Sequence, residues 1–319
     1  MKLIVQIPCF NEEQNLRQTV ADIPRNIDGI DEVRVLIVDD GSTDGTAEVA
    51  REAGVDYVIR HKTRRGLARA FRTGIDACLN LGADIIVNTD GDNQYAGKEI
   101  PALCRPILDG TADIVIGDRQ THAIQHFSLL KKNLQKIGSA LVRKLSKTDV
   151  KDVVSGFRAM SREAALQINI VSSFSYTVEM IIQAGKKQIA ITSVPVDTNA
   201  KTRESHLFRS IPQFIFDQVA TIIRMYAMFQ PLKVFFYLGL LLSVSGVIPI
   251  IRFLYFYMSG EGAGHLQSLV LGGVLLMMGF ITFMIGLVAD LISFNRQLLE
   301  MTLERVKFLE FRQNESTRK

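Results

Sequence analysis

Two long stretches near the C-terminus contain no charged residue, and they constrain the fold of this chain more than any other feature. Val234–Ile251 is 18 residues long and Leu266–Ala289 is 24 residues long. As helices they would measure about 27 and 36 Å, and roughly 30 Å is enough to cross the hydrocarbon layer of a membrane. A short glycine-rich linker, Ser259–His265, separates them. The pattern predicts a transmembrane hairpin, in preference to a helical hairpin buried in a soluble core.

The distribution of basic residues predicts the orientation of this hairpin. Lys and Arg occur on both sides of it, whereas the linker 259–265 has none. They are Arg203, Arg209, Arg224 and Lys233 before the hairpin, and Arg296, Arg305, Lys307 and Arg312 after it. Because basic residues are enriched on the cytoplasmic side of membrane proteins, we predict a multi-pass protein of the cell membrane whose N-terminal part is cytoplasmic.

The chain divides into four parts on these grounds. Residues 1–206 are expected to form a cytoplasmic domain. Residues 207–231 are mostly apolar but interrupted by charges, which predicts amphipathic helices on the membrane surface, with an ordinary core helix as the alternative. Residues 232–292 would hold the hairpin, with spans at about 234–257 and 266–289, and residues 293–319 a cytoplasmic C-terminal helix and tail.

Short apolar runs alternate with helical patterns over the N-terminal part. The expected strands are Leu3–Ile7, Val33–Val38, Tyr57–Ile59, Ile85–Asn88, Ile114–Ile116 and Ile189–Val194. The expected helices between them include Glu12–Ile23, Thr46–Ala53 and Leu67–Leu81. Strands of this kind separated by helices predict an α/β fold with a mostly parallel, Rossmann-like sheet covered on both faces. Ligands of such sheets bind beyond the carboxyl ends of the strands.

Several function classes are excluded or disfavoured by what the sequence lacks. Its three cysteines form no CxxC pair, which excludes a disulfide framework and a cysteine-rich zinc module. The net charge of +4 is too small to argue for nucleic acid as a partner. No GxGxxG follows the first strand and no GxxxxGK[ST] occurs, so neither a Rossmann dinucleotide site nor a P-loop is supported.

Polar and acidic motifs instead follow three of the expected strands. They are Pro8–Glu13, Val38–Gly45 and Asn88–Gln94. In the second motif two carboxylates are adjacent, and such a pair is costly unless each one accepts hydrogen bonds. One can accept from backbone N–H groups of the turn, and the other from a ring N–H such as that of a nucleotide base. Each motif alone is weak, but three at successive strand ends point to one site.

The third motif has the donor set of a hard divalent cation. Residues i and i+2 of an extended chain face the same side, so Asp90, Asp92 and Gln94 can present three oxygens to one point. Oxygen ligands suit Mg²⁺ or Mn²⁺, which also bind substrate phosphate. Gly91 would let a ligand approach the backbone closely.

With these motifs the chain resembles the family 2 glycosyltransferases of GT-A fold, and among them the polyprenyl-phosphate glycosyltransferases related to dolichol-phosphate mannose synthase. The resemblance extends from Met1 to about Phe208. Later motifs occur in the family's order, namely Gly117–Arg119, Asp152–Arg158, Tyr176–Glu179, Val194–Val196 and Arg203–Leu207. It implies a GT-A catalytic domain over residues 1–206 and is compatible with a homo-oligomer.

The resemblance also implies roles for individual residues. The nucleotide-sugar residues would be Pro8, Phe10, Glu12, Asp40, Asp90, Gly91, Asp92 and Arg203, with Asp40 at the base. The metal ligands would be Asp90, Asp92 and Gln94, and the acceptor phosphate would meet Arg119, Lys131 and Arg158. The catalytic residues would be Asp92, Asp152, Arg119 and Arg203. Asp152 would help to place the sugar or the acceptor.

The expected reaction is transfer of one hexose-type sugar from a nucleotide sugar to a membrane polyprenyl phosphate, undecaprenyl or dolichyl, with inversion. A phosphate monoester needs no general base, since its second pKa of about 6 leaves it anionic at neutral pH. The sequence favours UDP over GDP without deciding between them, and it does not identify the sugar. Two alternatives stay open: transfer to a hydroxyl acceptor with Asp152 as base, and a non-catalytic membrane-anchored nucleotide-sugar-binding protein. A processive polysaccharide synthase is disfavoured, because its Gln-x-x-Arg-Trp motif needs a tryptophan and the chain has none.

Overall fold

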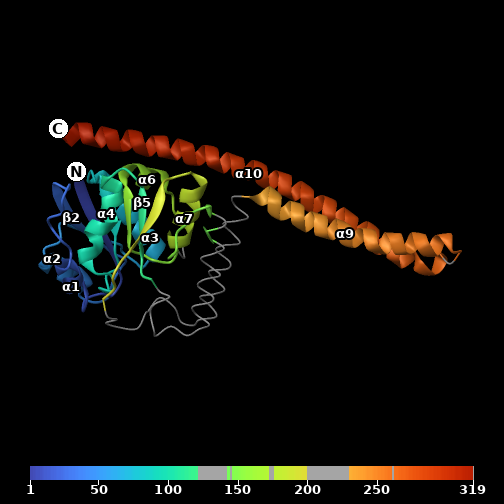
Figure 1. Cartoon of the computed structure of the whole chain (residues 1–319), viewed down its shortest axis with the longest axis horizontal. Helices are drawn as coiled ribbons and strands as arrows, with labels where there is room; N and C mark the ends of the chain where they lie inside the picture. Colours follow the sequence, from blue (N-terminus) through green and yellow to red (C-terminus); the bar gives the residue numbers. More distant parts are fainter. Residues whose placement is uncertain (121–141, 144–145, 172–175, 200–229, 261, 319) are drawn as a thin grey trace. The chain divides into compact units, whose positions relative to one another are not determined.

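Seven strands form one sheet in the computed structural model, which describes residues 1–120, 142–143, 146–171, 176–199, 230–260 and 262–318 (Figure 1). The strands are β1 (Lys2–Cys9), β2 (Glu32–Asp39), β3 (Tyr57–Arg60), β4 (Ile85–Asn88), β5 (Ile114–Asp118), β6 (Arg158–Ser161) and β7 (Ile191–Pro195). Their order is β3-β2-β1-β4-β6-β5-β7. Strand β6 runs antiparallel to both neighbours, and the other pairs are parallel.

This topology confirms the expected α/β fold and adds a strand that the sequence analysis missed. All six expected strands are present, within a few residues at each end. The additional strand is β6, which is completely buried and consists of Arg, Ala, Met and Ser. It lacks the β-branched or aromatic run that predicts a strand, and its position between β4 and β5 results from tertiary packing.

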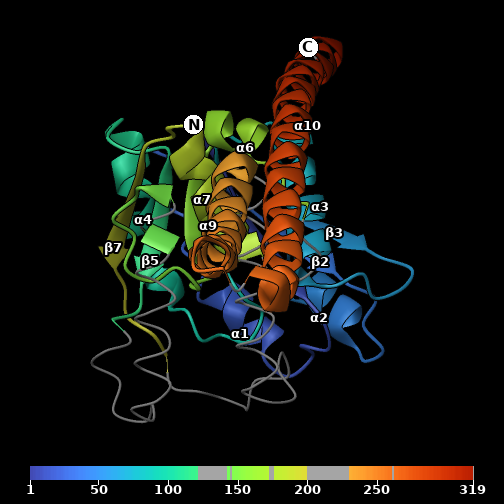
Figure 2. The ribbon, with the colours of Figure 1, turned by 90° about the vertical axis from the view of Figure 1, so that its right-hand side faces the viewer.

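Helices cover both faces of the sheet (Figures 1 and 2). They are α1 (Leu16–Ala21), α2 (Thr46–Glu52), α3 (Leu67–Asn80), α4 (Ile100–Leu108), α6 (Arg162–Gln167) and α7 (Tyr176–Lys186), with a short 3₁₀ turn at Gly97–Glu99. The first expected helix is shorter than predicted, because residues 10–15 form a turn in which Asn11 has a φ of 56°. That turn forms part of the site described below.

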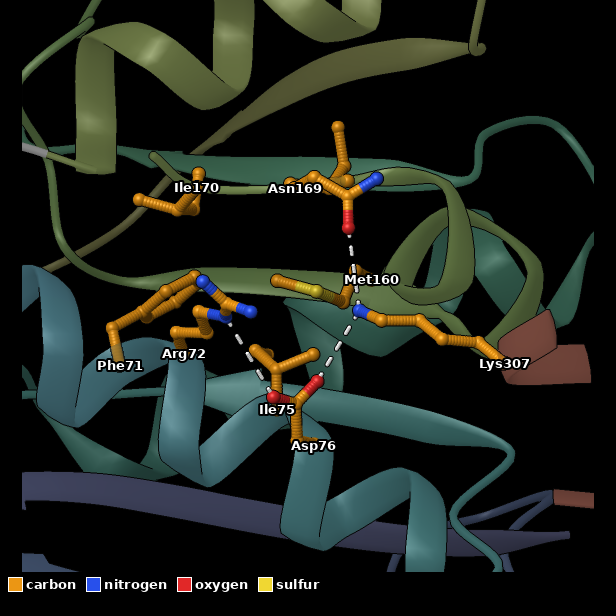
Figure 3. A pocket seen from close by; sticks show the side chains of 9 residues that line it. Phe71, Arg72, Ile75, Asp76, Met160, Asn169, Ile170 and Lys307 are labelled. Atoms are coloured by element: carbon orange, nitrogen blue, oxygen red, sulfur yellow. Dashed lines mark hydrogen bonds and ion pairs between the residues drawn. The ribbon is translucent and has the colours of Figure 1, made fainter. Parts of the chain in front are cut away.

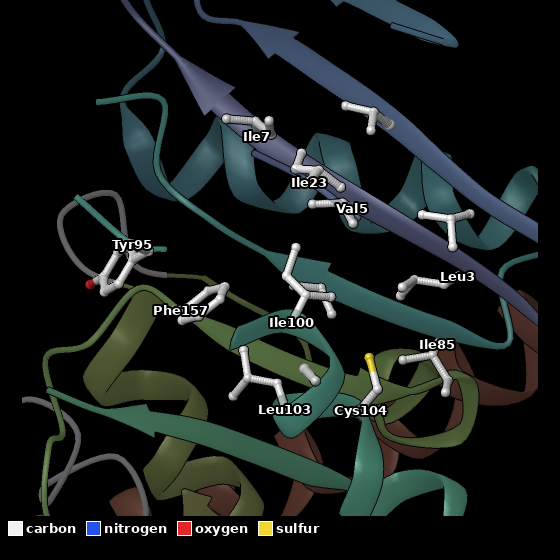
Figure 4. Close-up of a cluster of buried hydrophobic side chains, with 14 of the residues drawn as sticks. Leu3, Val5, Ile7, Ile23, Ile85, Tyr95, Ile100, Leu103, Cys104 and Phe157 are labelled. Atoms are coloured by element: carbon white, nitrogen blue, oxygen red, sulfur yellow. The ribbon is translucent and has the colours of Figure 1, made fainter. Parts of the chain in front are cut away.

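Alternation along β1 explains the two-layered core. Leu3, Val5 and Ile7 lie on one face and pack with Ile100 and Leu103 of α4, all of them fully buried (Figure 4). On the other face α3 approaches β1 so closely that a Cβ added at its Gly74 would lie 2.0 Å from the Gln6 side chain. Successive residues of β1 are therefore buried on opposite faces of the sheet, as expected for a central parallel strand.

Two helices near the C-terminus are long and apolar enough to cross a membrane. They are α9 (Pro231–Met258) and α10 (Leu266–Arg318), joined by a linker with a 3₁₀ turn at Gly262–His265. In their most apolar windows only 11% and 17% of the residues are buried, which is unlike the mostly buried helices of a soluble core. The predicted second span and the C-terminal helix form one uninterrupted helix, since no Gly or Pro follows Gly286.

Glycines spaced by seven residues form the contact between α9 and α10. A Cβ added at Gly239 would lie 2.9 Å from the carbonyl oxygen of Gly279, and one added at Gly246 would lie 2.9 Å from that of Gly272. A Cβ on Gly286 would lie 2.7 Å from Phe235. The two backbones therefore touch, as small residues allow in membrane helix pairs.

A bulky side chain at this contact should separate the two helices. We expect Gly279→Leu to lengthen the distance between spin labels at the exposed positions Leu240 and Phe280, measured by pulsed electron resonance in lipid. Gly273→Leu is the matched control, because a Cβ at Gly273 meets nothing within 4 Å. An unchanged label distance in Gly279→Leu would contradict the close backbone contact.

The chain divides into two compact units, Met1–Thr221 with Glu304–Lys319, and Ile222–Leu303. The first unit contains the sheet and the second contains the paired parts of α9 and α10. The predictions for Lys131, for Arg203 and for the surface helices at 207–229 lie outside the described residues.

Candidate active site

One rim of the sheet collects the predicted motifs. The carboxyl ends of β1, β2, β4, β5 and β7 point to this rim, and the antiparallel β6 begins there. Motifs that follow the parallel strands therefore meet the motif that precedes β6, Asp152–Arg158. This is the rim at which parallel sheets bind ligands.

Hydrogen bonds connect the loops after β1 and β2. Asn11 donates its backbone N–H to Ser42 Oγ at 3.0 Å, and Glu12 donates its own to Thr46 Oγ1 at 2.9 Å. Pro8 is buried within β1, and Glu12 is 8% exposed. The Phe10 ring carries the Arg64 guanidinium 4.1 Å from its centroid. The first two motifs thus form one preorganised surface, and its contact with a nucleotide stays a prediction.

Asp40 anchors the loop after β3. Asp40 is only 3% exposed, and its Oδ1 lies 2.8 Å from His61 Nδ1. The same carboxylate accepts backbone N–H groups from Arg65 at 2.9 Å and Gly66 at 2.7 Å. The carboxylate therefore has the hydrogen bonds that its burial requires, all from within the protein. In the structure Asp40 stabilises the loop after β3. Its contact with a nucleotide base stays a prediction.

The loop after β4 forms a tight turn around the two acidic residues of the third motif. Asp92 Oδ1 accepts the backbone N–H of Gln94 at 3.1 Å. Gly91 is buried, and a Cβ there would lie 3.0 Å from both Cys9 Sγ and Glu12 Cγ. In the structure Gly91 permits a close approach to the protein's own first motif, and the predicted approach of a ligand to its backbone stays a prediction.

The electrostatics of this loop fit a divalent cation. Burial, together with the nearby Asp92 carboxylate, raises the pKa of Asp90 to about 7, while Arg119 and Arg158 act in the opposite direction. Two nearby carboxylates disfavour each other's ionised form, and a cation between them would stabilise both charges. No group of three or more His, Cys, Asp or Glu suited to a metal occurs among the described residues. The predicted donor set of two carboxylates and the Gln94 amide would leave positions for phosphate oxygens.

The Gly156 backbone lies close to the Asp90 carboxylate. A Cβ at Gly156 would lie 3.0 Å from both carboxylate oxygens of Asp90. The Gly156 N–H donates to Tyr95 Oη at 2.9 Å, and its carbonyl accepts from Asn88 Nδ2 at 2.8 Å. Asn88 Nδ2 also lies 3.0 Å from Tyr176 Oη. This buried network places the start of β6 directly beside the acidic loop.

Arg119 and Asp152 form a bidentate pair at the end of β5. Arg119 Nε lies 2.7 Å from Asp152 Oδ2, and Nη2 lies 3.0 Å from Oδ1. The Asp152 side chain is 1% exposed and that of Arg119 is 23% exposed. Asp152 was predicted to help place the sugar or the acceptor. In the structure both of its oxygens accept hydrogen bonds from Arg119, and its role toward substrates stays a prediction.

Arg158 is not an acceptor-phosphate residue in this structure, contrary to the sequence analysis. It is 0% exposed. Its guanidinium donates to the carbonyl oxygens of Ser155 at 2.7 Å, Thr177 at 2.8 Å and Val153 at 2.9 Å. Burial lowers the pKa of Arg158 to about 10, which leaves it cationic at neutral pH. Arg158 therefore supports the site from within the core.

The described residues of the first unit line at least two pockets. A polar one of about 370 Å³ lies at the ends of β5 and β7 and is lined by Lys98, Arg119, Gln120, Val196, Asp197, Thr198 and Asn199. A much smaller one contains none of the predicted site residues (Figure 3). In it the Lys307 ammonium lies 3.3 Å from both Asp76 Oδ1 and Asn169 Oδ1. The polar pocket, which contains Arg119, adjoins the site.

Sequence reasoning missed His61, Tyr95, Tyr176 and Asn199, although all of them contact site residues. Their partners are distant in the chain. Tyr95 Oη accepts a hydrogen bond from the Gly156 N–H, and Tyr176 Oη accepts one from Asn88 Nδ2. Tyr176 does fall within one motif of the resemblance. The others follow no pattern that would indicate such contacts, which only the folded sheet reveals.

A comparison with known families shows which family the chain belongs to. The sequence model described as glycosyl transferase family 2 matches residues 4–168. The chain is a family 2 glycosyltransferase. In solved structures, this glycosyltransferase resembles glucosyl-3-phosphoglycerate synthase from Mycobacterium tuberculosis, in complex with Mn²⁺, UDP-glucose and phosphoglyceric acid. That likeness has a TM-score of 0.56 at 21% identity over 70% of this chain and 79% of the other, and it shows the GT-A fold.

Several relatives of this glycosyltransferase are named as polyprenyl-phosphate enzymes. The undecaprenyl-phosphate mannosyltransferase of Micrococcus luteus is 27% identical over 61% of this chain and 83% of its own. The dolichol-phosphate mannosyltransferase of Pyrococcus furiosus is 30% identical over 64% of this chain and 58% of its own. A UDP-N-acetylglucosamine–dolichyl-phosphate N-acetylglucosaminyltransferase of Methanococcus voltae is 28% identical over 60% and 83%. The three names share a polyprenyl-phosphate acceptor, and the sugar is mannose in two of them and N-acetylglucosamine in the third.

Proposed function

We propose that this glycosyltransferase moves one hexose-type sugar from a nucleotide sugar, with UDP as the favoured nucleotide, to polyprenyl phosphate, with inversion. Relatives with undecaprenyl and dolichyl phosphate in their names support this acceptor class. The catalytic domain, residues 1–206, would work at the cytoplasmic face of the cell membrane. The hairpin of α9 and α10 would cross that membrane twice, in accord with the length and composition of both helices.

The observation that carries the proposal is a partly exposed Arg119 fixed beside an acidic loop. Asp152 holds two of the Arg119 donor nitrogens, so the guanidinium has a defined position before any substrate binds. Its partial exposure, and its place in the lining of the polar pocket, leave it accessible to a phosphate. An anionic acceptor is therefore attracted to a rim whose other residues would bind the donor.

Asp90, Asp92 and Gln94 would hold Mg²⁺ or Mn²⁺, which supplies charge stabilisation for the leaving diphosphate. The acceptor phosphate oxygen would attack the anomeric carbon on the face opposite the leaving group. Arg119 would orient that phosphate, and no residue needs to remove a proton from it. The work of the protein is therefore positioning and electrostatics.

The same geometry argues against a hydroxyl acceptor. Such an acceptor needs a general base within hydrogen-bond reach, and Asp152 was the predicted one. Both of its oxygens accept hydrogen bonds from Arg119, and its side chain is 1% exposed, which leaves it little access to a substrate proton. In the described residues Asp152 is thus a partner of Arg119 and is not placed to accept a substrate proton.

Transfer into a lipid phase tests the proposal. The full chain in membranes would be incubated with polyprenyl phosphate, Mg²⁺ and a panel of radiolabelled nucleotide sugars, followed by extraction into organic solvent. We expect label from one donor to enter the organic phase only when polyprenyl phosphate is present. Label that appears only in water-soluble products would favour a hydroxyl acceptor, and absence of any transfer or hydrolysis would favour a non-catalytic binding protein.

A further inference from the structure

We propose that Asn199 is a positioning residue for the cation-binding loop, which it holds from the opposite side of the rim. The inference rests on the proposed function, because it concerns the loop that would bind Mg²⁺ or Mn²⁺ there. Asn199 follows β7, about one hundred residues after that loop in the sequence, and it belongs to none of the motifs described above. Its chemistry is that of a hydrogen-bond donor to the loop backbone.

Asn199 donates two hydrogen bonds to successive carbonyl groups of the loop. Its backbone N–H reaches the carbonyl oxygen of Gln94 at 2.9 Å, and its side-chain Nδ2 reaches that of Asn93 at 3.0 Å. Next to it, Thr198 forms an antiparallel bridge with Tyr95. The segment after β7 therefore holds three consecutive loop residues, directly after Asp92.

The loop after β4 makes a sharp turn at Asn93. This residue is 3% exposed and has a φ of 56°, a left-handed conformation that Asn adopts more readily than most residues with a Cβ atom. The Asp92 carboxylate closes the turn from within by accepting the Gln94 N–H at 3.1 Å. Asn199 binds the carbonyl groups on the outside of the same turn, so the directions of the Asp92 and Gln94 side chains depend on it.

The position also favours Asn over Asp. A carbonyl oxygen accepts only, so its partner must donate, and the Asn side chain has an NH₂ group whereas a carboxylate has none. Asn199→Asp keeps the shape and replaces the donor with a charged acceptor that faces the Asn93 carbonyl. Mutation of a residue that orients the metal ligands typically weakens metal binding about 10- to 100-fold.

Mn²⁺ binding measures this role directly. Electron paramagnetic resonance would follow free Mn²⁺ during titration into the full chain in detergent with UDP present. For Asn199→Asp and Asn199→Ala we expect the Mn²⁺ dissociation constant to rise about tenfold or more. The Mn²⁺ concentration for half-maximal sugar transfer should rise in parallel, with kcat at saturating Mn²⁺ close to that of the unaltered protein.

Asn80→Asp is the matched control. Asn80 Nδ2 also donates to a backbone carbonyl, that of Asp76 at 3.0 Å, but at the exposed end of α3. We expect its Mn²⁺ affinity to be unchanged. Equal Mn²⁺ affinities in the Asn199 variants and the unaltered protein would overturn the inference. If Asn199→Asp does not fold, as judged by circular dichroism, the milder Asn199→Ala decides. Failure of the unaltered protein to bind Mn²⁺ would instead refute the cation in the proposed function.

Discussion

Asp92→Asn should abolish almost all sugar transfer while the protein keeps its fold. The substitution removes one of two carboxylates from the loop and with it a formal charge that would balance the cation and the leaving diphosphate. We expect kcat to fall about a thousandfold, the scale on which the loss of one group that stabilises developing charge is felt. Transfer of radiolabelled sugar into an organic extract, at several Mg²⁺ and Mn²⁺ concentrations, measures the effect.

Asp109→Asn serves as the control for this change. Asp109 is an exposed residue that pairs with Arg105 at the end of α4, away from the rim motifs, and its substitution should leave transfer unchanged. The folded state of both variants can be compared by circular dichroism. Full activity of Asp92→Asn in the presence of a chelator would refute the role of a cation at this loop.

Arg119→Ala should eliminate transfer for two separable reasons. It removes the cation that would orient the acceptor phosphate, and it leaves the buried Asp152 carboxylate without its partner. Breaking a buried ion pair from one side typically costs about 3 to 5 kcal/mol of stability. The single variant therefore cannot distinguish a binding role from a folding role, unless its stability is restored.

The double variant Arg119→Ala/Asp152→Ala makes that distinction. With both charges removed, no uncompensated carboxylate stays in the core, so the melting temperature should recover most of what Arg119→Ala loses. Transfer should stay about a hundredfold or more below that of the unaltered protein, because the phosphate still lacks its cation. The KM for polyprenyl phosphate and the melting temperature are the two readouts. Recovery of transfer together with stability would show that Arg119 has only a structural role.

Much of the fold could be predicted from local sequence, because buried parallel strands are continuous apolar runs. Strands β1, β2 and β4 have such runs, and their positions were predicted to within a few residues. Strand β6 could not be predicted in this way, since Arg158 occupies a fully buried strand position. A charged residue in a polar motif suggests a ligand contact, and only the tertiary structure shows that its guanidinium binds three backbone carbonyls.

The same distinction applies to the site. The positions of the acidic loop and of Arg119 follow from strand ends, which local patterns locate well. The partners of these residues do not, because they come from other parts of the chain: Gly156 lies against Asp90, and Asn199 holds the loop after Asp92. Sequence spacing therefore identified the residues of the rim but not the pairings that orient them.

The antiparallel strand has a consequence for how the chain folds during synthesis. Strand β5 pairs only with β6 and β7 among the described strands, and it emerges from the ribosome about 40 residues before β6. The nascent chain therefore contains β1 to β5 before the strand that joins β4 to β5 has been made, and β7 comes last. Because Asp152 and Gly156 directly precede β6, we expect this part of the candidate site to be assembled only when β6 pairs with β4 and β5.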